Sequence, residues 1–175
     1  MKKLITLLII LTLATGGIFA SPDAFLEFST LVDQIQGMKI TASQFTGTSL
    51  EALANAEEVT SYTVTSGGSF EVGWISVISN NRTGYEVTMS ATAMASTETP
   101  VSYINYTISL GTAMITTNGA TPVSLQPPSY VFKVASLDSL TPNSRKITLI
   151  VSDDALNSAV EGQYTGTVTF SFTAT

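Results

Sequence analysis

The sequence predicts an all-β fold, an antiparallel β-sandwich that follows an N-terminal signal peptide. Short segments in which apolar side chains alternate with Ser and Thr recur along the chain, and clusters of Asn, Gly and Pro separate them. The clearest segment is 162–175, whose apolar side chains share one face: Tyr164, Val168, Phe170, Phe172 and Ala174. Successive side chains of a strand point to opposite faces, so this segment indicates a strand with one dry face and one face of hydroxyl groups.

The N-terminus has the order of basic, apolar and small residues that is typical of a secretory signal peptide. Met1-Lys2-Lys3 precedes an apolar run from Leu4 to Leu13, and small residues lead to Ala20, after which we expect cleavage. An uncleaved membrane anchor is the alternative, but the apolar run is shorter than the roughly 20 residues that span a bilayer. We therefore expect a signal peptide at 1–20, one domain at 21–175, no stable membrane span after cleavage, and export to the periplasm or the cell surface.

Composition excludes several functional classes. Without Lys2 and Lys3 the formal charge of −6 becomes −8, and the few remaining cations form no basic patch, so we expect no nucleic-acid partner. The chain has no cysteine and no histidine, which excludes disulfides, Cys/His zinc sites, the Ser-His-Asp triad and a Cys nucleophile. We expect a protein that is not an enzyme, with no catalytic, cofactor-binding or metal-binding residues and no cofactor.

The first half of the chain predicts strands at 25–32, 38–41, 60–65, 70–79 and 85–94. Residues 60–65 alternate around Tyr62 and Val64. Residues 70–79 are apolar on both faces, with Ile75 and Val77 on one and the following residues on the other: Phe70, Val72, Trp74 and Ile78. A strand that is apolar on both faces is expected in the centre of a sheet, with Trp74 in the core. It favours a sandwich over a barrel. Residues 50–58 are helix-forming but few, which predicts a helical turn in a connection.

A hairpin is predicted around residues 80–84. This Asn-Asn-Arg-Thr-Gly stretch is a turn signal, because Asn and Gly tolerate positive φ. Residues 85–94 then alternate strictly between apolar and polar. Two strand patterns around a short turn indicate that 70–79 and 85–94 pair with each other.

The second half predicts further strands at 101–110, 113–117, 130–135, 146–152 and 162–175. The strand at 113–117 is short and suits an edge. Three prolines break the stretch between it and residue 130, so any strand there is short or peripheral. Residues 153–161 are a polar connection.

Candidate chemical groups are few. Asp153 and Asp154 lie in that polar connection, but no calcium-loop spacing is present, and a solvated acidic loop is the simpler interpretation. Scattered carboxylates select no pair for glycoside hydrolysis. Tyr103 is out of phase with Ile104, Tyr106 and Ile108, so it faces away from the core; it is the candidate ligand contact, for instance with a glycan.

Four motifs carry a resemblance to a known group: Ser79-Asn-Asn-Arg-Thr-Gly-Tyr-Glu-Val-Thr-Met-Ser90, Ile104-Asn-Tyr-Thr-Ile108, Arg145-Lys-Ile-Thr-Leu-Ile-Val151 and Gly162-x-Tyr-x-Gly-x-Val-x-Phe170. In their order and strand pattern they resemble bacterial fimbrial (pilin-like) subunits and spore-coat-protein-U-like secreted domains of the cysteine-free type. The resemblance covers roughly the second half of the exported chain. It implies an immunoglobulin-like sandwich that lacks its last strand, with the gap filled by the N-terminal extension of a neighbouring subunit.

The candidate donor strand is the segment 23–32, in which Leu26, Phe28 and Val32 share one phase. Two alternatives stay open: the segment is the first strand of its own sheet, or it is helical, since Phe25, Phe28 and Leu31 also fit helical spacing.

These observations lead to one functional expectation and one alternative. We expect a non-enzymatic exported β-sandwich that serves as a structural or adhesive subunit of the bacterial envelope or of a fimbria-like assembly. Its partners are then copies of itself or related envelope subunits, joined by strand addition. The alternative is a free-standing module that binds a glycan or another envelope component.

Overall fold

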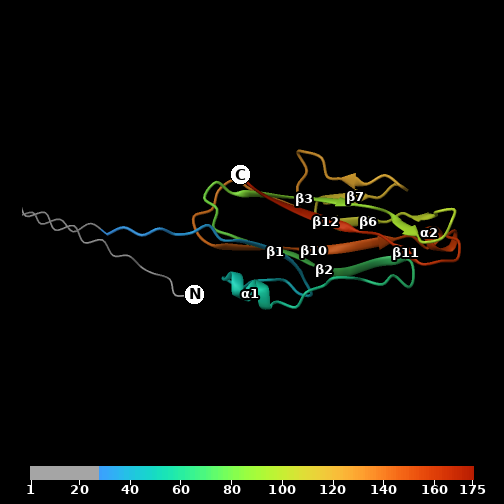
Figure 1. Ribbon diagram of the computed structural model, residues 1–175, viewed down its shortest axis with the longest axis horizontal. Coiled ribbons are helices and arrows are strands. Elements are labelled where there is room, and N and C mark those ends of the chain that lie inside the picture. Colours follow the sequence, from blue (N-terminus) through green and yellow to red (C-terminus); the bar gives the residue numbers. More distant parts are fainter. Residues whose placement is uncertain (1–27) are drawn as a thin grey trace, which may run out of the picture. The chain divides into compact units, whose positions relative to one another are not determined.

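The alternating segments pair into antiparallel sheets that stack in two layers, which confirms the predicted all-β sandwich (Figure 1). The structure is a computed structural model that describes residues 28–175. The expected signal peptide, its cleavage site and the first residues of the candidate donor segment lie outside the described residues. Residues 34–175 form one compact unit, and the described residues before them belong to another.

The first layer is a five-stranded sheet with the spatial order β1-β2-β10-β6-β7. Its strands are β1 (Gln36–Thr41), β2 (Gly68–Ser79), β10 (Thr141–Val151), β6 (Thr107–Leu110) and β7 (Ala113–Thr116). A short helix, α1 (Leu50–Asn55), begins at Ser49, whose side chain accepts a hydrogen bond from the Ala52 amide. This helix confirms the predicted helical turn, and its Leu53 packs on Phe45 and Ile78.

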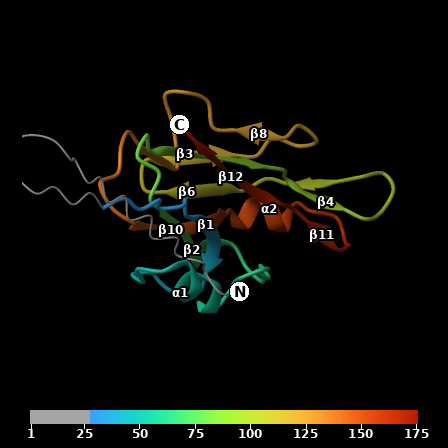
Figure 2. The same cartoon turned by 60° about the vertical axis from the view of Figure 1, so that its left-hand side comes forward.

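The second layer contains a four-stranded sheet with the order β12-β3-β8, in which β9 also pairs with β3. Its strands are β12 (Val168–Ala174), β3 (Tyr85–Ala91), β8 (Val123–Ser124) and β9 (Phe132–Val134). A small third sheet holds β11 (Tyr164–Thr165), β4 (Met94–Ser96) and β5 (Tyr103–Ile104). A second helix, α2 (Asp153–Asn157), lies in the predicted polar connection. Figure 2 shows α2 beside β12 and β11.

The strand order matches an immunoglobulin-like sandwich. In that fold one sheet has the order A-B-E-D and the other places strand F between strands C and G. The strands β1, β2, β10 and β6 take the first order, and β3 and β12 take the positions of C and F. Among residues 28–175, no strand occupies the position of G, next to β12.

The predicted hairpin is wrong, although the predicted turn is right. Gly84 has a φ of +84°, and its amide donates to the Asn81 carbonyl at 2.9 Å. However, β2 pairs with β1 and β10, whereas β3 pairs with β12, β8 and β9. The turn is therefore a corner between the two layers. It allows the inward side chains of both strands to bury against one another across the core, which a flat hairpin would prevent.

A β-bulge changes the phase of β2. The register between β2 and β10 shifts at Ile147/Thr148, which leaves Val72 as an extra residue. Val72 therefore packs against the same core as Ile75, while Trp74 is half-buried on the outer face, with the Lys146 ammonium 5.5 Å from its ring centroid. The prediction that Val72 and Trp74 share a face was wrong because a period of two cannot anticipate an inserted residue.

Two predicted strands do not form. Residues 60–65 belong to no strand, and neither do residues 28–32 of the predicted strand at 25–32. The last predicted strand is divided into β11 and β12, because the chain leaves one sheet for another at residues 166–167.

The core between the layers is apolar, and the polar side chains buried in the molecule have hydrogen-bond partners. Tyr85 is completely buried, and its hydroxyl accepts a hydrogen bond from the Asn143 amide at 2.8 Å. On the outer side of the first sheet, a chain of hydroxyl groups joins Thr41 to Ser76 at 2.8 Å and Ser76 to Ser144 at 2.9 Å. These contacts leave no buried side-chain polar atom of the described residues without a partner.

Because the chain has no disulfide, stability depends on this packing. We expect Ile75→Ala, at a position 1% exposed, to lower the free energy of unfolding by about 2–5 kcal/mol, since it leaves a cavity between the layers. The matched control is Ile150→Ala, at a position 40% exposed, which should cost about 1 kcal/mol or less. Urea unfolding measures both. Equal losses would contradict the placement of the core.

Candidate binding groove

The apolar face of β12 is only partly covered. Its residues Val168, Phe170 and Phe172 pair with three residues of β3, namely Ala91, Met89 and Val87. The β3 side chains are 0–2% exposed. Their partners on β12 point the same way but are only half-buried, because no strand covers the far side of β12 within residues 28–175. The dry face that the sequence predicts for this strand is therefore half open.

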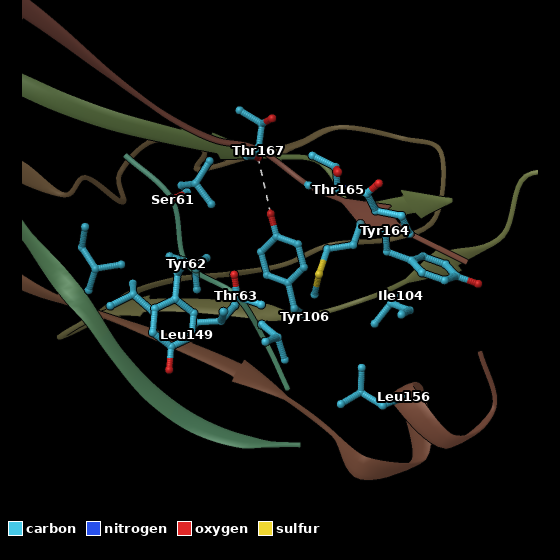
Figure 3. A pocket seen from close by; sticks show the side chains of 18 of the residues that line it. Ser61, Tyr62, Thr63, Ile104, Tyr106, Leu149, Leu156, Tyr164, Thr165 and Thr167 are labelled. Atoms are coloured by element: carbon cyan, nitrogen blue, oxygen red, sulfur yellow. Dashed lines mark hydrogen bonds between the residues drawn. The ribbon is translucent and has the colours of Figure 1, made fainter. Parts of the chain in front are cut away.

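A groove of about 940 Å³ runs along this open side between the layers. Its wall on one side comes from β11 and β12, and on the other from β1, β2 and residues 59–64. The floor is mostly apolar and includes Ile104, Tyr106, Ile108, Ile147 and Leu149. Figure 3 shows Tyr106 standing in the groove between Tyr62 and Tyr164, with Leu156 of α2 at its lower border.

Tyr106 joins the floor of the groove to its wall. Its side chain is 5% exposed, and its hydroxyl donates to the Thr167 carbonyl at 3.4 Å, the contact drawn as a dashed line in Figure 3. Burial disfavours the phenolate and raises the pKa of Tyr106 from 10.0 to about 12. The hydroxyl is therefore a neutral hydrogen-bonding group at physiological pH.

Residues 59–64 form one lip of the groove without belonging to a sheet. The Val59 amide donates to the Ile40 carbonyl at 3.0 Å, which attaches the start of the segment to β1. Beyond that point, Tyr62 is 47% exposed and its ring lies 5.8 Å from that of Phe70. The alternation of this segment predicted a strand, and the structure instead places it as irregular chain along the open side.

The start of the compact unit is attached to the turn between β2 and β3. The residues before it, up to residue 33, are called the N-terminal extension below. The Ile35 amide donates to the Asn80 side chain at 2.6 Å, and the Asn80 amide donates to the Ile35 carbonyl at 3.1 Å. The end of β12 is attached to the same turn, since Thr175 exchanges hydrogen bonds with Thr83. The point where the extension begins and the point where β12 ends thus lie at the same end of the sandwich.

The residues predicted from the sequence lie at separate places. Tyr103 is 41% exposed, as its phase indicates, but it does not line the groove, and its role as a ligand contact stays a prediction. Of the candidate donor residues, Leu26 lies outside the described residues, while Phe28 and Val32 are 77% and 75% exposed. The resemblance implied a missing last strand, but the residues that line the groove were not predicted. The only signal of the groove in the sequence is the strongly apolar face of the last strand.

The acidic residues do not gather. Asp153 and Asp154 lie in the first turn of α2, where the Ser152 hydroxyl accepts from the Ala155 amide. Carboxylates favour that position because of the partial positive charge of a helix N-terminus. In the part of the chain that the structure describes, no three His, Cys, Asp or Glu side chains come together as metal ligands, and no helix is long and apolar enough to cross a membrane.

Comparison with known proteins identifies no relative. No family model matches the chain, and neither a curated protein nor a solved structure is significantly similar to it.

The raised pKa of Tyr106 leads to a prediction about alkaline stability. Because folding favours the protonated phenol, Tyr106 contributes to the free energy of unfolding. This contribution is fully present below pH 10 and is lost as the pH rises toward about 12. We expect Tyr106→Phe to show a smaller loss of unfolding free energy across this range than the unmodified protein, as measured by urea unfolding at several pH values. Burial also raises the pKa of Tyr85, so part of the dependence should remain. An unchanged pH dependence would contradict the burial of Tyr106.

Proposed function

We propose that this protein is a non-enzymatic, exported structural subunit of the bacterial envelope that assembles with copies of itself by strand addition. The observation that carries the proposal is the open side of β12. Its three inward side chains are half-buried, its outer edge has no partner strand among the described residues, and an apolar groove runs beside it. An open strand edge next to an apolar groove is the arrangement that β-strand addition uses.

A strand suits this groove better than a small molecule. The outer edge of β12 offers a row of backbone N–H and C=O groups, which an added strand satisfies with a ladder of hydrogen bonds. The side chains of that strand would alternate, so every second one would enter the groove and cover Val168 and Phe170. One added strand would thus complete both the sheet and the core.

The N-terminal extension has the pattern that such a strand needs. Leu26, Phe28 and Val32 share one phase, and Phe28 and Val32 are largely exposed. No charged residue shares that phase within the segment 23–32. The occupant that we propose for the groove is therefore the segment 23–32 of a second copy.

Geometry disfavours filling of the groove by the protein's own extension. The seven residues of β12 span about 20 Å, and the added strand of an immunoglobulin-like sandwich is antiparallel to the strand at this position. Antiparallel self-insertion would carry Val32 to the start of β12, while Ile35 is held at the turn near its end. Three residues reach only about 11 Å. A second copy is free of this constraint.

Donor and acceptor are then different surfaces of one subunit. An interface between two different surfaces is heterologous, and it produces an open chain of subunits unless its rotation happens to close a ring. The proposed assembly is accordingly a filament-like polymer in which each subunit completes the next.

Light scattering coupled to size-exclusion chromatography tests this assembly on residues 21–175. We expect multimers from the unmodified chain and a monomer from Phe28→Asp, because a carboxylate would enter the apolar groove. Leu31→Asp is the matched control. Leu31 is 88% exposed and lies in the opposite phase, so this variant should still form multimers.

A peptide of residues 22–33 provides a second readout. The monomeric Phe28→Asp protein keeps its own groove open, so it should bind the unmodified peptide but not the peptide with the same substitution. A monomeric unmodified protein that also ignores the peptide would refute strand addition and favour the free-standing binding module.

A further inference from the structure

An arginine on β10 points toward the inside of the sandwich. Arg145 pairs with Ile75 of β2, which is 1% exposed in the core between the layers. Directly opposed residues of neighbouring strands share a face of the sheet, so Arg145 faces the second layer. Its guanidinium carbon lies 5.2 Å from the ring centroid of Phe132 on β9, and its side chain is half-buried.

This arginine has no carboxylate partner. The three lysines of the described residues all have one: Lys39 lies 3.7 Å from Glu58, Lys133 lies 2.8 Å from Glu86, and Lys146 lies 2.6 Å from Glu71. Arg82 is unpaired as well, but it is exposed, on the turn at 80–84. Among residues 28–175, Arg145 is thus the half-buried cation without a counter-ion, in a chain whose net charge is −6. Partly buried charges are normally paired.

The side chain lines a polar pocket of about 340 Å³. The other lining residues come from the β6–β7 turn, the loop before β9, and β9 itself: Thr112, Ala113, Pro128, Ser129, Tyr130 and Lys133. The Lys133 ammonium lies 4.5 Å from the ring centroid of Tyr130. The pocket therefore combines an unpaired guanidinium, an ammonium that is paired with Glu86, two aliphatic hydroxyl groups and an aromatic ring. It shares no residue with the groove beside β12.

We propose that this pocket binds a sugar that carries a carboxylate, of the hexuronate class. The Arg145 guanidinium presents paired N–H donors whose geometry matches a carboxylate. The Lys133 ammonium, whose charge Glu86 balances, offers a further N–H donor. The hydroxyls of Thr112 and Ser129 suit the hydroxyl groups of a sugar, and the Tyr130 ring offers an apolar face. The volume lies at the lower end of the range for small-molecule sites, as a single sugar ring requires.

The site is independent of strand addition, because a polymer formed through the groove leaves these residues uncovered by the added strand. An assembled protein would then carry one such pocket per subunit. Although each single site would bind weakly, an acidic polysaccharide that spans several subunits would bind with a higher overall affinity, because it contacts several pockets at once.

Titration calorimetry on the Phe28→Asp form of residues 21–175 tests the pocket without interference from assembly. The probes are glucuronate, glucose, acetate and inorganic phosphate. We expect millimolar-range binding of glucuronate and at least about tenfold weaker binding of the other three, because only glucuronate offers both the carboxylate and the ring. No binding of glucuronate, or equal binding of glucose, would overturn the proposal. Equal binding of acetate or phosphate would overturn the assignment to a sugar.

Two variants locate the binding. Arg145→Gln should weaken glucuronate binding by about tenfold or more, whereas Arg82→Gln, which removes an exposed unpaired arginine far along the sequence, should leave it unchanged. Circular dichroism and the urea midpoint verify folding. If Arg145→Gln does not fold, Tyr130→Ala provides the same test at a loop position, where reduced preference for glucuronate over acetate is expected. Binding that is unaffected in the folded variants would place the ligand elsewhere and refute the site.

Discussion

Burial of β2 and β10 against β3 across the space between the layers is the interaction on which the rest of the structure depends. Without disulfides, no covalent cross-link other than the backbone connections holds the two sheets together. Ile75, Val77 and Val87 are 0–1% exposed, so the hydrophobic effect acts at full strength at this point. The corner at residues 80–84 follows from it, because β2 and β3 must turn their apolar faces toward each other. Gly84 is required at that corner, since a Cβ there would collide with the Val134 carbonyl.

The same burial between the layers explains why the apolar side chains of β12 are only half-buried. An inner strand of a sandwich is covered by the facing layer and by its two neighbours in the sheet. β12 has the facing layer and one neighbour, so Phe170 keeps contact with the core but not full burial. Completion of the open side of β12 requires backbone hydrogen bonds and apolar side chains together, which is why a strand is the natural occupant.

The sequence determines which residues alternate but not which strands become neighbours. The class of fold, the turn at 80–84, the short helix at α1 and most strand positions follow from side-chain periodicity and turn chemistry. Strand pairing is a long-range property, so the partners of β3 could not be predicted from the local sequence. The bulge at Val72 also shifted the alternation of β2 by one residue. Residues 60–65 have the alternation of a strand but no neighbouring edge with which to form a ladder.

The sites were predictable to different degrees for the same reason. The exposure of Tyr103 follows from its phase within a short strand pattern. The groove depends on a strand that is missing beside β12, and absence of a neighbour leaves no mark on the residues themselves. The inward position of Arg145 depends on the register between β10 and β2, since outside that register it reads as an ordinary surface cation at the start of an apolar run.

The outward position of Trp74 has a consequence for spectroscopy. It is the only tryptophan in the chain, and the bulge places its indole beside the Lys146 ammonium on the outer face of the first sheet. Its fluorescence therefore monitors the outer face of the first sheet, and is a poor probe of events between the layers. Optical signals from occupancy of the groove would come from the phenol rings of Tyr62, Tyr106 and Tyr164, which line it.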